Sequence, residues 1–424
     1  MIENTFKVKL LYLTNEEEKM LRGDYGPGVQ KAMEILTAIG DLNDAKRMIS
    51  ISSAHMAGNY GVLREEGVEW LEWFAESAKV KVFTSVNPQG FDFDLWREMD
   101  VPETFRRIQL RIDNALKRLG VKLFYTCQQF LVGNLPKKGE HIAWAASETE
   151  IFANSVLGAM TNREGDHSAL AAAVVGKTPE YGMHLPENRV GNILVDVGEL
   201  DFCKLTQTDY AAIGYYVGKV VGDKIPVFVG LPKDISLQNL QALAYPLPVS
   251  GAVPMFHLVG ITPEAPTIEA AFGGDKPEDK ITVATSDIKR VYEESRRTTK
   301  EKVDLVIFGC PHCTLQEIEE IAAMLSGRKV FDGVKLWVCT SKSTKVIAER
   351  MGYGDVIRSA GGMLIADTCP SGGPYAYLKE KGVEVVVTNS LKAAYYAYGL
   401  FGMGTIFAST KDCVEAAIKG RWER

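Results

Sequence analysis

The chain alternates short apolar runs with polar loops and with stretches of helical periodicity. The loops are rich in Gly, Ser, Thr, Asn and Pro, and the clearest helical stretch spans Leu315–Leu325. Strands that alternate with helices are typical of α/β proteins built around a parallel sheet. In the C-terminal part this pattern predicts four strands, at Val303–Phe308, Lys335–Cys339, Gly362–Ala366 and Val383–Val387.

The N-terminal part repeats the pattern, with predicted strands at Arg47–Ile51, Val80–Phe83 and Val121–Tyr125. Loops follow these strands at residues 52–58, 84–88 and 126–127. The length of 424 residues suits two or three domains, and a charged stretch with Gly and Pro, residues 263–302, separates the two parts. We therefore predict a multi-domain α/β protein with an N-terminal region over 1–285 and a C-terminal domain over 286–424, the boundary being placed to within about 20 residues.

Residues with reactive or polar side chains follow the predicted strands in both parts. In open parallel sheets, ligands bind beyond the carboxyl ends of the strands, where loops meet helix N-termini. We therefore predict a cleft between the two halves that is lined by thiols, amides and a lysine. Its residues are His55, Asn87 and Cys127 from the first part, and Cys310, Cys339, Cys369 and Lys392 from the second.

Composition excludes some classes of protein. Lys+Arg is 48 against Asp+Glu 54, a net charge of -6, which argues against nucleic acid or an anionic membrane as a partner. The N-terminal segment (residues 1–21) lacks the long apolar core of a signal peptide. Two long uncharged stretches, 241–262 and 393–410, contain prolines or glycines and do not resemble membrane-spanning helices. A cytoplasmic location is the expectation.

Seven cysteines are too few, and odd in number, for a disulfide scaffold. Cys310 and Cys313 form a lone CxxC, which without a second pair is weak evidence for zinc and leaves a redox pair as an alternative. Cys127, Cys310 and Cys369, on three separate loops, suit an iron–sulfur cluster with one iron open to a substrate oxygen. For each cysteine taken alone, a small buried hydrophobe is the simpler interpretation, and it is the one we apply to Cys203, Cys413 and, at a strand end, Cys339.

Several segments together resemble the signature of the aconitase X family. They run in the family's order over nearly the whole chain, which makes the combination specific. The matching segments are Gly139-Glu-His-Ile-Ala-Trp144, Ala153-Asn-Ser-Val-Leu-Gly158-Ala-Met-Thr-Asn-Arg-Glu-Gly165, Gly176-Lys-Thr-Pro-Glu-Tyr-Gly182, Glu187-Asn-Arg189, Ser250-Gly-Ala252, Gly260-Ile-Thr-Pro-Glu-Ala265, Gly309-Cys-Pro-His312 and Asp367-Thr-Cys369.

The resemblance implies an aconitase-like hydro-lyase whose iron–sulfur cluster, [4Fe-4S] or [3Fe-4S], is held by three cysteines at the positions of Cys127, Cys310 and Cys369. Members of the family dehydrate either 5-phosphomevalonate or cis-3-hydroxy-L-proline, so a small anionic substrate of this kind is expected. The family pairs a large portion such as this one with a small swivelling portion, fused or separate. We expect a separate small subunit that supplies a catalytic serine, without which this chain is inactive.

Two segments depart from the family pattern close to the predicted pocket. Archaeal relatives read close to Gly-His-x-Ser-Gly-Val-Ser where this chain has Ala54-His-Met-Ala-Gly-Asn-Tyr60. After Cys127 the usual Thr-Pro-Tyr is replaced by Gln128-Gln-Phe130. The chemistry is therefore better supported than either substrate. We regard Cys313 as an inert thiol at the start of a helix.

Candidate roles follow from residue type and position. The predicted catalytic residues are His55, Glu148 and Lys392. His55 could act in acid–base catalysis or make a hydrogen bond within its loop, and Glu148 could be a base or a residue on a helix surface. Lys392, a cation near a helix N-terminus, could bind a carboxylate or phosphate. Arg163 and Arg189 are predicted to form structural ion pairs. Predicted substrate contacts are Gly58, Asn59, Tyr60, Asn87, Pro88, Asn154 and Ser390.

Two other classes of function stay open on sequence alone. One is a non-catalytic iron–sulfur or thiol protein, such as a redox sensor that uses Cys310 and Cys313. The other is a degenerate subunit that acts only as a scaffold. The three cysteines on loops argue against the scaffold, whose cysteines would have no reason to remain there.

Overall fold

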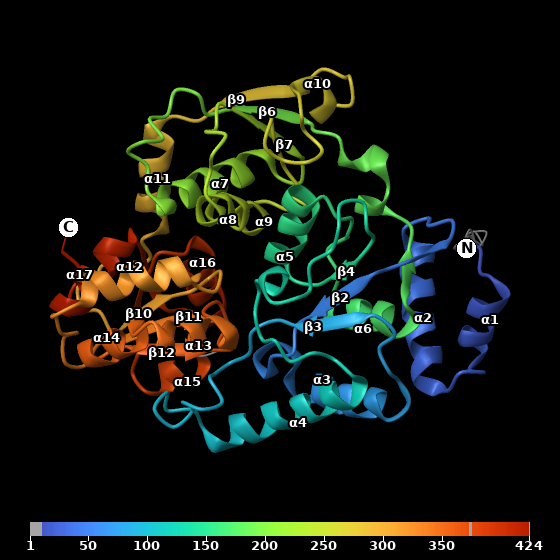
Figure 1. Cartoon of the computed structure of the whole chain (residues 1–424), viewed down its shortest axis with the longest axis horizontal. Coiled ribbons are helices and arrows are strands. Elements are labelled where there is room, and N and C mark those ends of the chain that lie inside the picture. Colours follow the sequence, from blue (N-terminus) through green and yellow to red (C-terminus); the bar gives the residue numbers. More distant parts are fainter. Residues whose placement is uncertain (1–10, 373–374, 424) are drawn as a thin grey trace, which may run out of the picture.

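The computed structural model describes residues 11–372 and 375–423, which form three α/β units (Figure 1). The first unit has a three-stranded sheet of order β3-β2-β4, the second a four-stranded sheet of order β8-β7-β6-β9, and the third a five-stranded sheet of order β12-β11-β10-β13-β14. Every strand pair in these three sheets is parallel. The predicted α/β class with parallel βα units is confirmed.

In the first unit, β2 is the central strand and places His55 opposite Ser85 and Trp144. The long helices cover the sheet, and Trp70 stacks on Phe74 (ring centroids 4.7 Å apart), one turn further along the apolar face of α3. The elements are α1 (Asn15–Arg22), α2 (Pro27–Leu42), β1 (Met48–Ser50), β2 (Ser53–Met56), α3 (Tyr60–Ser77), β3 (Phe83–Val86), α4 (Glu103–Leu119), η1 (Gln129–Leu131), β4 (Ala143–Trp144), α5 (Ser147–Phe152), the π-helix η2 (Ala153–Leu157), α6 (Asp166–Val175) and β5 (Lys177–Pro179), which pairs antiparallel with β1.

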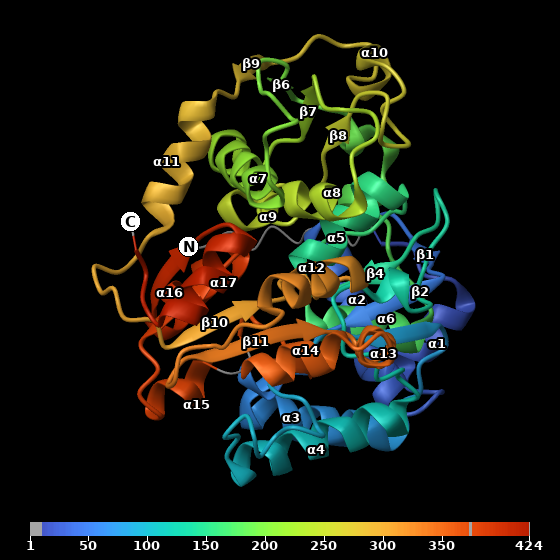
Figure 2. The same ribbon diagram turned by 60° about the vertical axis from the view of Figure 1, so that its left-hand side comes forward.

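The second unit lies above the other two, with α7, α8 and α9 between its sheet and the rest of the molecule (Figures 1 and 2). Its core is continuous with that of α5 and η2 in the first unit. Two short 3-10 helices, η3 (Gly182–His184) and η4 (Pro186–Arg189), connect the two units. The elements are β6 (Ile193–Asp196), α7 (Gln207–Val221), β7 (Pro226–Val229), α8 (Leu237–Ala244), α9 (Leu247–Ser250), β8 (His257–Leu258), α10 (Ile268–Ala271), β9 (Asp279–Thr282) and α11 (Thr285–Ser295).

The third unit has an apolar core on each face of its sheet. Along β10, Val306 and Phe308 enter one core, whereas Leu305 and Ile307 enter the other, which also contains Phe91 and other residues of the first unit. The third unit is thereby packed against the first. The elements are β10 (Leu305–Phe308), α12 (Leu315–Leu325), β11 (Lys335–Thr340), α13 (Lys342–Arg350), α14 (Tyr353–Ala360), β12 (Met363–Ala366), α15 (Tyr375–Glu380), β13 (Val385–Thr388), α16 (Leu391–Phe401), β14 (Gly404–Phe407) and α17 (Thr410–Lys419).

The N-terminal strands differ from the prediction. His55 lies inside β2 and not in a loop, because the buried strand contains the polar residues Ser53 and His55 and so lacks an apolar run. The strand predicted at Val80–Phe83 lies slightly later, as β3 (Phe83–Val86). The third strand of this sheet along the chain is β4 (Ala143–Trp144), and residues 121–125 contribute only an isolated bridge between Lys122 and Ser85. The proposed boundary at 285/286 falls at the start of α11, and the division into two domains stays a prediction.

Residues 1–10, which form the first part of the segment judged not to be a signal peptide, lie outside the described residues. In the ranges 11–372 and 375–423, no helix is both long and apolar enough to cross a membrane.

Candidate active site

Three cysteine thiols from separate loops come together where the first and third units meet. Cys310 follows β10, Cys369 follows β12, and Cys127 lies on a loop of the first unit. The backbone N–H of Cys369 donates to the carbonyl of Gln89 in the first unit (2.7 Å). The Sγ of Cys127 accepts the N–H of His312 from the Cys310 loop (3.4 Å). The three cysteines that the sequence selected therefore share one site.

A glycine shapes the Cys310 loop. Gly309 has φ +106°, and a Cβ at this position would lie 2.2 Å from the carbonyl oxygen of Cys339 at the end of β11. Only glycine allows the loop to pass this close to the neighbouring strand. The turn leaves the Cys310 Sγ 2.7 Å from the Oγ of Ser371, which lies on the Cys369 loop.

Burial makes the three free thiols hard to ionise. It raises the pKa of Cys127 well above its usual range and that of Cys369 to about 12, and the nearby Cys310 adds to both shifts. Burial also raises the pKa of Cys310, although the cation of Lys392 partly offsets this. The thiols would therefore ionise only together with a bound cation that stabilises the thiolates.

Among the described residues, no three His, Cys, Asp or Glu side chains converge to hold a single metal ion. Such convergence is the arrangement of a mononuclear site, in which all ligands share one metal. In an iron–sulfur cluster each cysteine binds a different iron, so its thiols stand apart.

A buried ion pair lies beside the thiols. Lys392, in the first turn of α16, donates to the carboxylate of Glu148 in α5. Burial opposes both charges, but the pairing prevails: the pKa of Glu148 is lowered and the pKa of Lys392 is raised. The two residues are therefore a carboxylate and an ammonium group at neutral pH.

Glu148 continues into a chain of hydrogen bonds through the first unit. Asn87 hydrogen-bonds to Glu148, and its Oδ1 lies 3.1 Å from the Nε2 of His55. The Nδ1 of His55 lies 2.8 Å from the Oγ of Ser85. Burial lowers the pKa of His55 to about 4, so the imidazole is neutral at physiological pH. Predicted residues His55, Asn87, Glu148 and Lys392 thus form one network.

A cavity of about 30 Å³ adjoins Cys310 and Lys392. It lies where the loops after β10 and β13 meet α7 and α8, so the second and third units both contribute to it. Of the residues predicted to line the cleft between the halves, Cys310 and Lys392 line this cavity, whereas His55, Asn87, Cys127, Cys339 and Cys369 do not. Ser390 lines the cavity and caps α16, its Oγ accepting the N–H of Ala393 (3.2 Å). The other polar lining residues are Gln207, Gln241, Tyr245, Glu317 and Asn389.

The remaining predicted substrate residues make local contacts. Asn59 caps α3, where its Oδ1 accepts the N–H of Gly61 (2.7 Å), and Tyr60 packs edge-on against Phe105. The carbonyl of Gly58 accepts a hydrogen bond from Gln109 (2.7 Å). Pro88 is buried and immediately precedes Gln89, which bridges to the Cys369 loop. Substrate contacts for Gly58, Asn59, Tyr60 and Pro88 stay predictions.

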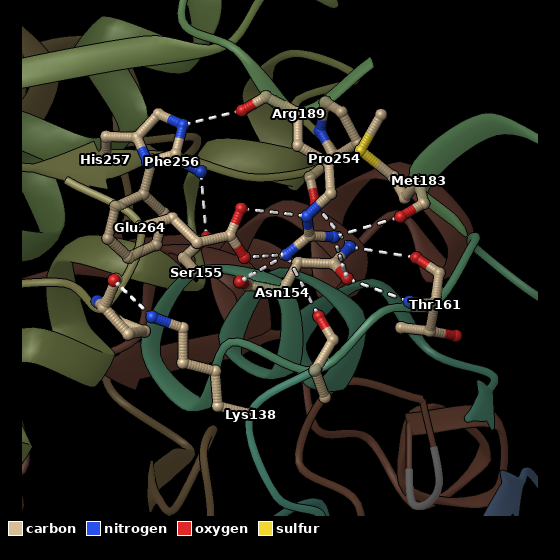
Figure 3. A network of polar contacts seen from close by, with 12 residues as sticks. Lys138, Asn154, Ser155, Thr161, Met183, Arg189, Pro254, Phe256, His257 and Glu264 are labelled. Carbon is tan, nitrogen blue, oxygen red and sulfur yellow. Dashed lines mark hydrogen bonds and ion pairs between the residues drawn. The ribbon is translucent and has the colours of Figure 1, made fainter. Parts of the chain in front are cut away.

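Asn154 lies in a different network, between the first two units (Figure 3). Its Nδ2 donates to the carbonyls of Thr161 (2.9 Å) and Pro254 (3.1 Å), and its Oδ1 accepts from Thr161 N–H (3.0 Å) and from Arg189 (3.2 Å). All its hydrogen-bonding capacity is used within the protein. The contacts therefore assign Asn154 to holding the units together and not to the substrate contact that we predicted.

Both arginines of the signature segments form ion pairs, as predicted. Arg189 pairs with Glu264 (Oε2 at 3.0 Å) and Arg163 pairs with Glu150 (2.6 Å). Among the other cysteines, Cys313, Cys339 and Cys413 are buried, whereas Cys203 is exposed. A buried hydrophobic role was therefore wrong for Cys203, which follows a turn at the surface.

Two residues that contact the thiol loops were not predicted from the sequence. Gln89 connects the Cys369 loop to the first unit. His312 is buried among all three loops. Its position within the motif Gly309–His312, two residues after a selected cysteine, was the available signal.

Comparison with known proteins covers nearly the whole chain. The chain matches three family models, which are described as the aconitase X first domain (residues 10–187), second domain (191–293) and third domain (303–419). A phosphomevalonate dehydratase large subunit from Methanocaldococcus jannaschii is 44% identical, over 97% of this chain and 100% of that protein. A cis-3-hydroxy-L-proline dehydratase from Pseudomonas aeruginosa is 32% identical, over 96% of this chain and 70% of that protein.

A solved structure has the same fold. The crystal structure of Thermococcus kodakaraensis aconitase X in its holo form is 37% identical in sequence, covers 96% of this chain and 100% of its own, and superimposes with a TM-score of 0.85. The predicted aconitase-like fold is therefore confirmed. With three consecutive family domains and dehydratases among its full-length relatives, the chain belongs to the aconitase X family and is a hydro-lyase.

Proposed function

We propose that the chain is the large subunit of an iron–sulfur-dependent dehydratase that removes water from 5-phosphomevalonate. The observation that carries the proposal is the convergence of Cys127, Cys310 and Cys369 beside the Glu148–Lys392 pair and the cavity. The substrate and the separate small subunit are supported by the relatives: this chain spans 100% of the M. jannaschii large subunit but 70% of the P. aeruginosa protein.

The donor set fits an iron–sulfur cluster. Cys127, Cys310 and Cys369 would hold it through three thiolates, and the N–H of His312 already points at one of these sulfurs. Removal of the thiol protons, which burial opposes, becomes favourable when iron is bound. When bound, the cluster supplies a Lewis-acidic iron for the departing hydroxyl.

The side chains of this protein supply charge and proton transfer. Lys392 would bind an anionic group of the substrate, helped by the free N–H groups at the start of α16. Glu148, which pairs with Lys392, would be the carboxylate that removes the proton next to the hydroxyl-bearing carbon, so that a carbon–carbon double bond forms as water leaves. Asn87 and neutral His55 would hold that carboxylate in place.

The substrate proposal predicts a preference between two compounds. Purified anaerobically with its small subunit, the enzyme is expected to dehydrate 5-phosphomevalonate with a kcat/KM at least about 10²-fold above that for cis-3-hydroxy-L-proline. The measurement is product formation by mass spectrometry with each compound. The reverse preference would assign the chain to the hydroxyproline type, and no turnover of either would overturn the proposed substrate class.

The cluster proposal predicts different outcomes for two neighbouring cysteines. Cys310→Ser is expected to abolish the visible absorbance and most of the bound iron, because it removes a ligand. Cys313→Ser is expected to keep both, because the Cys313 thiol is buried in the apolar core of the third unit. Equal loss from both variants would favour the alternative of a Cys310–Cys313 redox pair.

The cytoplasmic location also stays a proposal. Seven free cysteines, including the thiols assigned to the cluster, suit a reducing compartment.

A further inference from the structure

One imidazole connects the three thiol-bearing loops. His312 lies on the Cys310 loop, and its side chain is almost fully buried. Its Nδ1 lies 3.2 Å from the Oγ1 of Thr126, the residue before Cys127. Its Nε2 lies 2.9 Å from the carbonyl oxygen of Thr368, the residue before Cys369. Each ring nitrogen therefore contacts the residue that immediately precedes a cysteine.

The partners define the protonation state of the ring. A carbonyl oxygen can only accept, so the Nε2 of His312 carries a hydrogen and donates to Thr368. In the neutral ring the Nδ1 then accepts from the hydroxyl of Thr126. Both ring nitrogens are satisfied, as a buried imidazole requires.

The backbone of the same residue adds a third contact. The N–H of His312 donates to the Sγ of Cys127 (3.4 Å). This bond crosses from the third unit to the first, and so does the bond to Thr126, which is 186 residues away in sequence. Hydrogen bonds from N–H groups to sulfur stabilise a thiolate over a thiol.

We propose that His312 is a positioning residue that holds the loops of Cys127, Cys310 and Cys369 at the separation an iron–sulfur cluster requires. The inference rests on the proposed function for the cluster itself, but the arrangement of the loops can be tested without it. His312 would not contact the substrate. It acts through the three thiols, in the way that partners beyond the ligands orient a metal site.

Two conservative variants each keep one of the two hydrogen bonds of the ring and remove the other. In His312→Asn the short amide can still accept from Thr126 but does not reach Thr368, whereas in His312→Gln the longer amide can donate to Thr368 but not accept from Thr126. His257→Ala is the matched control, because that histidine is also buried and its Nε2 donates to a carbonyl, that of Arg189 (2.7 Å), in the network of Figure 3.

The first readout is retention of iron under an anaerobic chelator challenge. We expect His312→Ala to lose iron about 10–100-fold faster than the wild type, the Asn and Gln variants to be intermediate, and His257→Ala to match the wild type. Iron loss from His312→Ala at the wild-type rate would overturn the proposal. Equal acceleration in His257→Ala would also overturn it, because a general loss of packing would then explain the effect.

The second readout uses the iron-free chain and mass spectrometry of cysteine alkylation. We expect Cys127 to be alkylated faster in His312→Ala than in the wild type, with no change in His257→Ala. Unchanged alkylation would overturn the proposal. If the wild type bound no iron at all, the cluster would fail as a proposal, and this readout would still decide the role of His312. If His312→Ala does not fold, Thr126→Val can replace it. This variant removes the hydrogen bond between Thr126 and the Nδ1 of His312 and leaves the backbone contacts of His312 in place.

Discussion

Replacing Lys392 by methionine is expected to lower kcat by about 10²–10⁴-fold and the free energy of unfolding by about 3–5 kcal/mol. Both effects have one cause. Without the ammonium group, Glu148 is a buried carboxylate with no counter-charge, its pKa rises, and it is protonated when a base is needed. The measurements are steady-state dehydration with the small subunit and anaerobic urea unfolding of the same preparation.

A partly exposed lysine that pairs with a buried glutamate provides the control for the Lys392 variant. Lys177 pairs with the buried Glu17 in the first unit (2.6 Å), far in sequence from the thiol loops. Lys177→Met is expected to destabilise the fold without lowering kcat. The double variant Glu148→Gln with Lys392→Met is expected to regain stability but not activity. Recovery of activity in the double variant would contradict the assignment of either residue to the reaction.

The same pair predicts how stability depends on pH. The pKa of Glu148 is lowered below its ordinary 4.5, so its contribution is present above that pH and is lost as the pH falls through the folded value. The pKa of Lys392 is raised above its ordinary 10.5, so its contribution is present below that pH and is lost only at still higher pH. Between these limits the pair is fully charged, and Lys392→Met removes its contribution throughout.

Replacing Arg189 by methionine is expected to lower the free energy of unfolding by about 3–5 kcal/mol without a direct effect on the thiols. The guanidinium is buried, pairs with Glu264, and donates to the carbonyls of Met183, Asn154 and Ala159 (3.1, 3.0 and 3.0 Å). Methionine leaves these acceptors buried without a donor. Urea unfolding is the measurement.

Two further arginine variants test the cause of the Arg189 effect. Arg189→Lys keeps the charge but has fewer donors and no planar fork, so we expect an intermediate loss of stability. Arg47 also pairs with a glutamate, Glu180 (2.6 Å), but its side chain is 66% exposed. Arg47→Met is therefore expected to leave the free energy of unfolding nearly unchanged. If Arg47→Met and Arg189→Met lowered the free energy of unfolding by similar amounts, burial of the Arg189 network would not explain the effect of Arg189→Met.

The sheet of the third unit could be predicted because its strands are continuous apolar runs. Leu305–Phe308 and Val385–Val387 are buried on both faces, so hydrophobicity alone indicates these parts of the strands predicted at Val303–Phe308 and Val383–Val387. In the first unit, β2 is equally buried but contains Ser53 and His55, whose polar groups are satisfied by partners on other segments. The apolar pattern therefore indicated β1 (Met48–Ser50), which pairs with β5, but missed β2 and placed His55 in a loop.

The site was predictable where position along a strand determines it. Cys310 and Cys369 come directly after strands of one parallel sheet, and such loops share an edge. Pairings across units could not be derived in this way. Lys392 and Glu148 are 244 residues apart, and Asn154 meets Arg189 because two units pack together. Residue type and local spacing contain no information about which units meet.

The joining of the first and third units at Gln89 and Cys369 would determine when the proposed cluster can be inserted. Cys127 and Cys369 are separated by 242 residues, which at about 5–20 residues per second takes the ribosome roughly 12–50 s to add. A cluster held by all three thiols must therefore wait until the third unit has been synthesised and has docked on the first. During that interval Cys127 lacks the contacts that the third unit supplies, such as the hydrogen bond from the N–H of His312.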